Sequence, residues 1–476
     1  MSGSQIKVID SFHLKSIVNQ RIEVLVPLSH SDKNGEKIRL VANITQKYDP
    51  AIHDTDELKD KVILPPNPKI ICYIQGGPGF PCPVPLGYSG KDKVLLEKGY
   101  QILYMDQRGT GLSTPIDSNF FKHRFSKHPE ETDSEYLDRK VKFILNFRAD
   151  SIVEDLEILR EILIGKETKW SLLGQSFGGF CAFTYLSFHP EALQEVLVTG
   201  GVPPIGFHPD DVYEATYKRT KERNVHYYDK YPQDVEKVKQ ISDYLSREHV
   251  ILPSGGTLSV ERFQQLGLNF GATGGTNAIH QIVMKFHYEL LTIGYPTLDT
   301  LNTVQNSLSF DTNVFYALFQ EAIYCSEPGI VSNWSADRLR YKEGNENFNY
   351  QIISQSTDPL YFTGEMVYKS NFSDYSELRS FHDLADALHA NGNWGKLYDL
   401  DKLNKISFSQ VPVVAASYFY DQYVDFGLTM AVKDRAFKGN GNLRQYITSD
   451  YFHNGVRENP EVVLNRLFDL LDCEVD

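Results

Sequence analysis

The chain of 476 residues has few cysteines, no excess of basic residues and no long apolar run. The five cysteines are scattered, with no CxxC pair and no Cys/His cluster of zinc spacing, so we expect no metal site. Acidic residues outnumber basic ones by 62 to 48, which gives a formal net charge of -14. Because such a molecule repels phosphate backbones and anionic lipid surfaces, we expect no nucleic-acid partner.

Two further absences concern location. No apolar stretch approaches the roughly 18 residues of a membrane-spanning helix, and residues 1–7 lack the apolar segment of a secretory signal. The sequence therefore predicts a cytoplasmic protein that does not associate with membranes. Its oligomeric state stays open, because periodicity does not show which apolar faces remain exposed.

What is present is typical of a large globular protein. Hydrophobic residues make up 41% of the chain, enough for a sizeable core. Because 476 residues exceed one average core, we expect several domains or one large domain with an insertion.

Short apolar runs that stop at glycines or turns dominate two parts of the chain. They lie at residues 69–74, 101–105, 170–173, 193–198, 411–416 and 443–448, and two alternating runs precede them at 22–26 and 38–42. Apolar runs separated by helical spacing are typical of parallel strands buried on both faces. The sequence thus predicts an α/β fold with a mostly parallel central sheet.

The segment between these two parts has a different rhythm. Residues 206–400 are rich in tyrosine, phenylalanine and charged residues, with helical patches and weak strand character. We therefore predict one sheet-containing core, formed by residues 1–205 and 401–476, and a mainly helical cap inserted at 206–400.

Residues 174–178 (Gly-Gln-Ser-Phe-Gly) match the pattern G-x-S-x-G around Ser176. The match alone is weak, but an apolar run precedes it and a plausible helix follows. This is the context of a nucleophile elbow, in which a sharp turn lifts the serine hydroxyl above the sheet edge. The alternative is a buried serine in a tight turn.

A serine nucleophile needs a base, and the base needs an orienting carboxylate. In this kind of sheet the expected chain order is serine, acid, histidine. Asp421 follows the run at 411–416, and His453 follows the run at 443–448. Both positions suit a triad with Ser176, although Asp425 competes with Asp421 for the role of the acid.

The oxyanion that forms during acyl transfer needs backbone N–H donors. We expect one from Phe177, directly after the nucleophile, and one from Gly77, in the turn after the run at 69–74. The alternative for the glycines at 76–79 is a simple tight turn. A phosphate cradle is disfavoured, because no Gly-Lys-Ser/Thr follows.

Three segments together resemble the signatures of proline iminopeptidases, serine aminopeptidases of the α/β-hydrolase fold. They are residues 75–79 (Gln-Gly-Gly-Pro-Gly), 106–111 (Asp-Gln-Arg-Gly-Thr-Gly) and 174–179 (Gly-Gln-Ser-Phe-Gly-Gly). The resemblance is closest to the long, fungal-type members and extends from about residue 20 to the C-terminus, including Asp421 and His453. Gln75 departs from the family, which usually begins the first motif with histidine, and the insertion is longer than in the compact bacterial enzymes.

The resemblance also implies how substrate is held. The family binds the free amino group of an N-terminal proline with glutamates of the helical cap, and Glu321 and Glu365 are the residues that match here. A pyrrolidinium cation removed from water does need carboxylates and an apolar wall. The alternative for each glutamate is an exposed helix face. Asp106 and Arg108 are expected to brace loops rather than to act in catalysis.

The sequence therefore predicts a serine aminopeptidase that releases N-terminal proline from short peptides through an acyl-enzyme, with no cofactor. One alternative is another α/β hydrolase acting on a small ester or amide, which would not require a free α-amino group. A second is a catalytically silent binding protein of the same fold, which the complete Ser/Asp/His set disfavours.

Overall fold

The computed structural model describes residues 6–438 and 441–473. In these residues a nine-stranded sheet has the order β1-β2-β3-β5-β4-β6-β7-β8-β9. The strands are β1 (Lys7–Leu14), β2 (Ile17–Pro27), β3 (Lys37–Lys47), β4 (Ile70–Ile74), β5 (Gln101–Met105), β6 (Trp170–Gln175), β7 (Leu193–Thr199), β8 (Val413–Tyr418) and β9 (Leu443–Thr448). Strands β4 to β9 are parallel to one another. At one edge of the sheet, β1 pairs antiparallel with β2, β2 with β3, and β3 with β5. The predicted α/β-hydrolase fold with its mostly parallel sheet is confirmed.

Strand β4 shows why the apolar runs become strands buried on both faces. Alternate side chains of a strand point to opposite faces, and those of Ile70, Cys72 and Ile74 enter one core cluster while Ile71 and Tyr73 enter the other. Helices α5 (Ala149–Ile164) and α6 (Phe177–Phe188) pack on the first face. Helices α2 (Gly90–Glu97) and α20 (Pro460–Leu471) pack against each other and on the second face.

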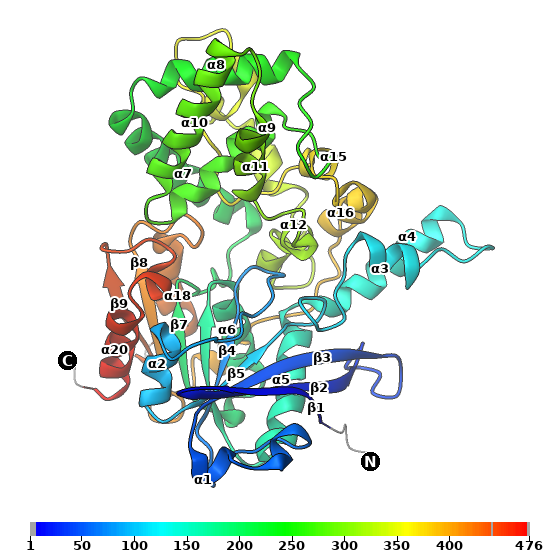
Figure 1. Ribbon diagram of the computed structural model, residues 1–476, viewed down its shortest axis with the longest axis vertical. Coiled ribbons are helices and arrows are strands. Elements are labelled where there is room, and N and C mark those ends of the chain that lie inside the picture. Colours follow the sequence, from blue (N-terminus) through cyan, green and yellow to red (C-terminus); the bar gives the residue numbers. More distant parts are fainter. Residues whose placement is uncertain (1–5, 439–440, 474–476) are drawn as a thin grey trace.

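Between β7 and β8 the described chain forms helices and loops without a strand of the sheet. These helices form a block above the sheet in Figure 1. They are α7 (Pro209–Lys230), α8 (Asp234–Arg247), α9 (Val260–Gln264), α10 (Gly275–Thr292), α11 (Leu298–Asn306), α12 (Val314–Phe319), α13 (Ser335–Arg340), α14 (Tyr350–Ile353), α15 (Asn371–Asp374), α16 (His382–His389) and α17 (Leu400–Leu403). We call residues 206–400 the cap; these boundaries stay predictions, and α17, at the second one, packs on α6 of the core.

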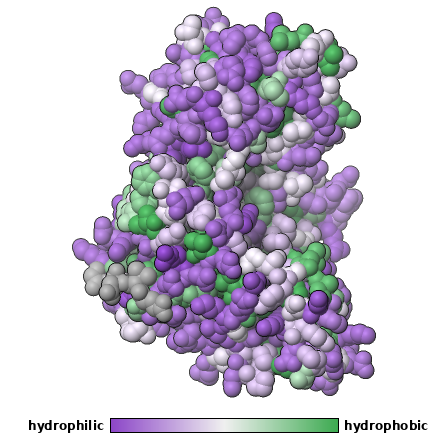
Figure 2. Space-filling view, turned by 60° about the vertical axis from the view of Figure 1, so that its left-hand side comes forward, coloured by the Kyte–Doolittle hydropathy of each residue, from purple (hydrophilic) through white to green (hydrophobic). Residues whose placement is uncertain are grey.

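The remaining helices lie outside the cap. They are α1 (Pro50–His53), α3 (Ser118–His123), α4 (Asp133–Ile144), α18 (Phe426–Ala436) and α19 (Gly455–Glu458), and short 3-10 turns occur at Asp56–Lys59, Leu145–Phe147, Pro190–Ala192, Gln265–Gly271, Ala322–Tyr324, Glu346–Phe348 and Arg379–Phe381. Most of the face shown in Figure 2 is hydrophilic, with apolar residues gathered mainly around its middle. No helix within the described ranges combines the length and the apolar character needed to cross a lipid bilayer.

Candidate active site

Ser176 occupies a one-residue turn between a strand and a helix. Strand β6 ends at Gln175 and α6 begins at Phe177. The backbone of Ser176 has φ 56° and ψ -126°, a left-handed conformation that L residues rarely adopt. Its N–H donates to the carbonyl of Thr199 at 3.0 Å, which ties the turn to the end of β7. This is the geometry that G-x-S-x-G predicts for a nucleophile elbow.

Glycines let the surrounding backbones approach this turn. A Cβ at Gly178 would overlap the carbonyl oxygen of Ile74, and a Cβ at Gly76 would lie 2.8 Å from the Cβ of Ser176. The loop after β4, the serine turn and the start of α6 therefore touch through bare backbone.

His453 and Asp421 meet at the carboxyl ends of the last two strands. His453 Nδ1 lies 2.8 Å from Asp421 Oδ2, and both side chains are buried. The other oxygen of Asp421 accepts from the N–H groups of Tyr423 and Val424 at 2.8 and 3.0 Å. A carboxylate accepts from Nδ1–H, so this arrangement leaves Nε2 of His453 available to take a proton.

Asp425, the alternative acid, has a different role in the structure. Its Oδ1 accepts from the N–H of Leu428 at 3.0 Å and caps the N-terminus of α18. The contacts therefore favour Asp421 as the partner of His453.

Ser176, His453 and the predicted oxyanion loop line one pocket of about 150 Å³. Gly77 and Glu365 line it as well, and Phe177 begins the adjacent helix, where the first N–H groups have no partner within the helix. The pocket is lined by Gln75, Gly76, Gly77, Phe80, Gln175, Ser176, Tyr316, Glu365, Tyr423, His453 and Arg457. Five of the seven residues predicted for the site either line this pocket or begin α6 beside it. Asp421 lies behind His453, and Glu321 is not in the lining.

Gln75, which stands where the resembled family usually has histidine, holds the first loop in place. Its side-chain oxygen accepts from the hydroxyl of Tyr73 at 3.0 Å, and its carbonyl accepts from the amide of Gln107 at 2.9 Å. Gln107 belongs to the second motif, so this contact connects the first two motifs directly.

Glu365 faces the pocket from the cap. Its Oε1 accepts from the hydroxyl of Tyr316 at 2.7 Å, and the Tyr316 ring stacks on Phe310 with centroids 4.9 Å apart. Burial raises the pKa of Glu365 to about 7, against the opposing effects of the His453 charge and the Tyr316 hydrogen bond. A carboxyl group whose pKa is raised to about 7 therefore lines the same pocket as the serine.

Glu321 lies inside the cap with its carboxylate fully engaged. Its oxygens accept from the N–H groups of Ser335 and Ala336 at 3.0 and 2.9 Å, at the start of α13. His389 Nδ1 lies 2.9 Å from the same carboxylate, and its ring stacks on Trp334. These contacts indicate a structural role, and the prediction that Glu321 touches substrate stays a prediction.

The electrostatics of His453 combine three neighbours. Burial by itself lowers the pKa of His453, but the charge and hydrogen bond of Asp421 raise this pKa by more. The charge of Glu365 raises it further. The result is a pKa raised above the ordinary value, although Arg457 opposes the change. The pocket therefore stabilises the imidazolium that forms when a serine gives up its proton.

Asp106 and Arg108 brace loops. Asp106 accepts from the N–H groups of Cys82 and Leu112, both at 2.8 Å. Arg108 forms a buried, forked ion pair with Asp155 at 2.7 and 2.6 Å.

Sequence reasoning missed four lining residues: Phe80, Tyr316, Tyr423 and Arg457. Tyr316 lies in α12, whose apolar neighbours do indicate a helix, and its polar tip is the signal that it faces a site. Arg457 lies four residues after His453 in the chain. A cation so close in sequence to the candidate base was the signal that could have identified it as a site residue.

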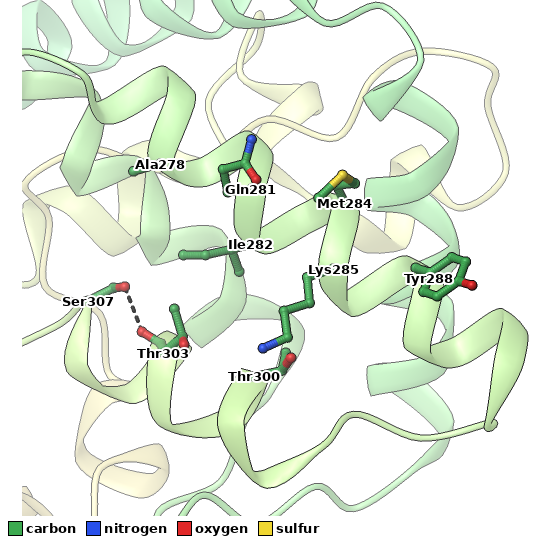
Figure 3. A pocket seen from close by; sticks show the side chains of 9 residues that line it. All are labelled: Ala278, Gln281, Ile282, Met284, Lys285, Tyr288, Thr300, Thr303 and Ser307. Atoms are coloured by element: carbon green, nitrogen blue, oxygen red, sulfur yellow. Dashed lines mark hydrogen bonds between the residues drawn. The ribbon is translucent and has the colours of Figure 1, made fainter.

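A larger hollow of about 550 Å³ lies elsewhere, between α10 and α11 of the cap (Figure 3). It is lined by Ala278, Gln281, Ile282, Met284, Lys285, Tyr288, Thr300, Thr303 and Ser307. Its cation, Lys285, is paired with Asp299, and none of the predicted site residues lines it. Size alone therefore does not locate the chemistry. No cluster of three or more His, Cys, Asp or Glu suited to a metal ion occurs in the described parts of the chain.

Comparisons with known proteins show what the chain is similar to. Residues 69–264 match the model of a family described as alpha/beta hydrolase fold. A proline iminopeptidase of Aeromonas sobria is 39% identical over 405 residues, which are 85% of this chain and 88% of that protein. A proline iminopeptidase of Aspergillus aculeatus is 34% identical over 455 residues, 95% of this chain and 93% of that protein. The crystal structure of a proline iminopeptidase of Mycobacterium smegmatis matches loosely, with 12% identity, a TM-score of 0.39 and coverage of 95% and 100%, and no conclusion depends on it.

Proposed function

The chain belongs to the proline iminopeptidases, a family of α/β hydrolases, and from this premise we propose that it is a serine aminopeptidase releasing proline from the N-terminus of short peptides. One observation carries the proposal. A nucleophile elbow, a His–Asp pair and a half-buried carboxylate from the cap meet around one small pocket.

In the first half of the reaction, Ser176 attacks the carbonyl carbon of the N-terminal proline. His453 takes the serine proton on Nε2, and Asp421 holds the ring by its Nδ1–H and stabilises the resulting imidazolium. The N–H groups of Phe177 and Gly77 donate to the oxyanion of the tetrahedral intermediate.

In the second half, the intermediate collapses and His453 gives its proton to the leaving amine. This step leaves proline esterified to Ser176. Water then attacks the ester while His453 again acts as the base, and free proline departs. Every step uses groups of this chain and water.

The cap supplies selectivity for a free amine. Ionised Glu365 is placed to bind the pyrrolidinium of the substrate, and the rings of Phe80, Tyr316 and Tyr423 surround the same space. A charged, hydrogen-bonded partner in a poorly hydrated site favours a cationic amine over an acylated one. Acylated peptides lose this interaction and leave the carboxylate without a partner.

The size of the pocket favours small substrates. At about 150 Å³ it lies below the roughly 300–1,000 Å³ of typical ligand sites. We expect such a space beneath a cap to accept the N-terminal proline of short peptides and to exclude the terminus of a folded protein.

The direct test compares proline arylamide with N-acetyl-proline arylamide, using the wild type and Ser176→Ala. Ser409→Ala, at an exposed serine of the core, is the matched control. We expect turnover of the free-amine substrate alone, lost in Ser176→Ala and kept in the control, with a fluorophosphonate probe labelling only proteins that retain Ser176.

Each alternative gives a different result. Equal turnover of the two arylamides would replace the proposal with a general ester or amide hydrolase. Absence of both turnover and labelling in the wild type would leave a catalytically silent member of the fold.

A further inference from the structure

Arg457 lies at the edge of the reaction pocket and is held next to the nucleophile. It belongs to α19, four residues after His453, and it lines the pocket with an exposed side chain. Its Nη2 donates to the side-chain oxygen of Gln175 at 3.2 Å. Gln175 directly precedes Ser176 in the chain, and Arg457 and Ser176 line the same pocket.

The charge of Arg457 is not neutralised by the protein. Some buried arginines of the chain have carboxylate partners, as Arg108 has Asp155 and Arg340 has Glu261. Within residues 6–438 and 441–473, no carboxylate oxygen lies within 4.0 Å of a side-chain nitrogen of Arg457. Its hydrogen bond to a neutral amide fixes the position of the guanidinium and leaves most of its N–H donors for a ligand.

Two opposite charges therefore border the pocket without pairing. Glu365 and Arg457 both line it and both act on His453, whose pKa Glu365 raises and Arg457 lowers, after the larger effects of burial and Asp421. Neither neutralises the other. The pocket thus presents an anion and a cation near the candidate base.

We propose that Arg457 binds the C-terminal carboxylate of dipeptide substrates, so that the preferred substrate class is Pro-Xaa with a free carboxylate. This inference rests on the proposed function. In Pro-Xaa the carboxylate belongs to the residue that follows the scissile bond, so it enters the site close to the nucleophile. Arg457 is held by Gln175, the residue beside the nucleophile, and lines the same pocket. A guanidinium binds a carboxylate through two parallel hydrogen bonds, a geometry that an amide or aryl group cannot reproduce.

Chain length limits the interaction. Each further residue moves the carboxylate at most about 3.3–3.6 Å along an extended peptide. Because Arg457 is held at Gln175, its guanidinium cannot reach a carboxylate that lies several residues further away. The preference for a free C-terminal carboxylate should therefore be strongest for dipeptides and vanish for tetrapeptides that begin with proline.

The test measures kcat/KM for Pro-Ala and for Pro-Ala amide, which share the proline and the scissile bond and differ only in the carboxylate. We expect the wild type to prefer Pro-Ala by about tenfold, the effect of one partly exposed charge-assisted contact. The ratio should fall to about one in Arg457→Met and stay intermediate in Arg457→Lys, which keeps the charge without the fork. Arg466→Met changes the net charge equally at an exposed position of α20 and should keep the ratio.

The ratio separates substrate binding from positioning. If Arg457 merely supports the serine turn through Gln175, Arg457→Met should lower kcat/KM for Pro-Ala and for Pro-Ala amide equally. The ratio of the two kcat/KM values would then persist, and the inference would be overturned. A wild-type ratio near one would do the same. Failure of the proposed function looks different: the wild type would then hydrolyse neither the two dipeptides nor proline arylamide, and the inference would fall with it.

Discussion

Replacing Glu365 with glutamine should make the protein more stable at alkaline pH and less active. Glutamine keeps the shape of the side chain and its oxygen can still accept from Tyr316. What it removes is a negative charge that burial disfavours.

The size of the stability effect follows from the raised pKa. Glu365 has a pKa of about 7 in the folded protein, against 4.5 for the free group. The difference is about 2.5, which at 1.36 kcal/mol for each pKa unit gives about 3 kcal/mol. The folded state retains the proton between these values and the unfolded state releases it. Wild-type stability from this group is therefore complete below pH 4.5 and is lost as the pH rises through about 7.

Glutamine does not titrate, so its advantage over glutamate should appear only with rising pH. Urea unfolding of the wild type and Glu365→Gln should give nearly equal free energies at pH 4.5, with the variant ahead by up to about 3 kcal/mol at pH 8.5. Glu343→Gln, at an exposed glutamate of the cap, should show no such dependence.

Activity should move in the opposite direction. Truncating one partner of a buried charge pair costs about 2–5 kcal/mol, so kcat/KM for proline arylamide should fall by about 100-fold. In the wild type kcat/KM should rise with pH as both Glu365 and His453 lose a proton, whereas the variant should keep only the His453 step. A stability difference that does not change with pH, or a variant with wild-type kcat/KM, would refute the reasoning.

Three more predictions follow from single contacts. Asp421→Asn should lower kcat by about 10⁴-fold, while Asp425→Asn, which still caps α18, should remain near wild type; the reverse order in a kinetic assay would exchange their roles. Glu321→Ala should destabilise the protein by about 3–5 kcal/mol because it removes the carboxylate beside His389 and the acceptor of the first N–H groups of α13, and a large rise in KM with unchanged unfolding would instead indicate substrate contact. Gly178→Ala should impair folding, since its methyl group overlaps a carbonyl oxygen of β4, and soluble, fully active protein in expression trials would contradict this.

The sequence predicted the central sheet well because its strands are buried on both faces. Such strands appear as continuous apolar runs, and the runs at 101–105 and 443–448 coincide with β5 and β9. Strand β1 was missed because it lies at the edge of the sheet with no fully buried residue, so its sequence has no clear apolar pattern. Apart from α7, α8 and α10, the helices within the cap have nine residues or fewer, which leaves little periodicity to recognise.

The site divides in the same way. The position of Ser176 depends on local backbone geometry, which a short motif encodes, and the family resemblance points to the same residue. The two cap glutamates look alike in sequence, with apolar neighbours and an expected helix face. Only tertiary contacts separate them: Glu321 meets the start of α13, whereas Glu365 meets Tyr316 and the pocket.

The residues proposed for bond breaking and those proposed for binding the amino group of the N-terminal proline come from separate stretches of the chain. Ser176 and His453 follow strands of the central sheet, while Tyr316, in α12, and Glu365, in the loop before α15, belong to the inserted cap. Selectivity can therefore diverge during evolution without a new catalytic centre. For the same reason, a laboratory that wants an aminopeptidase for another N-terminal residue should randomise the inserted helices and leave the sheet untouched.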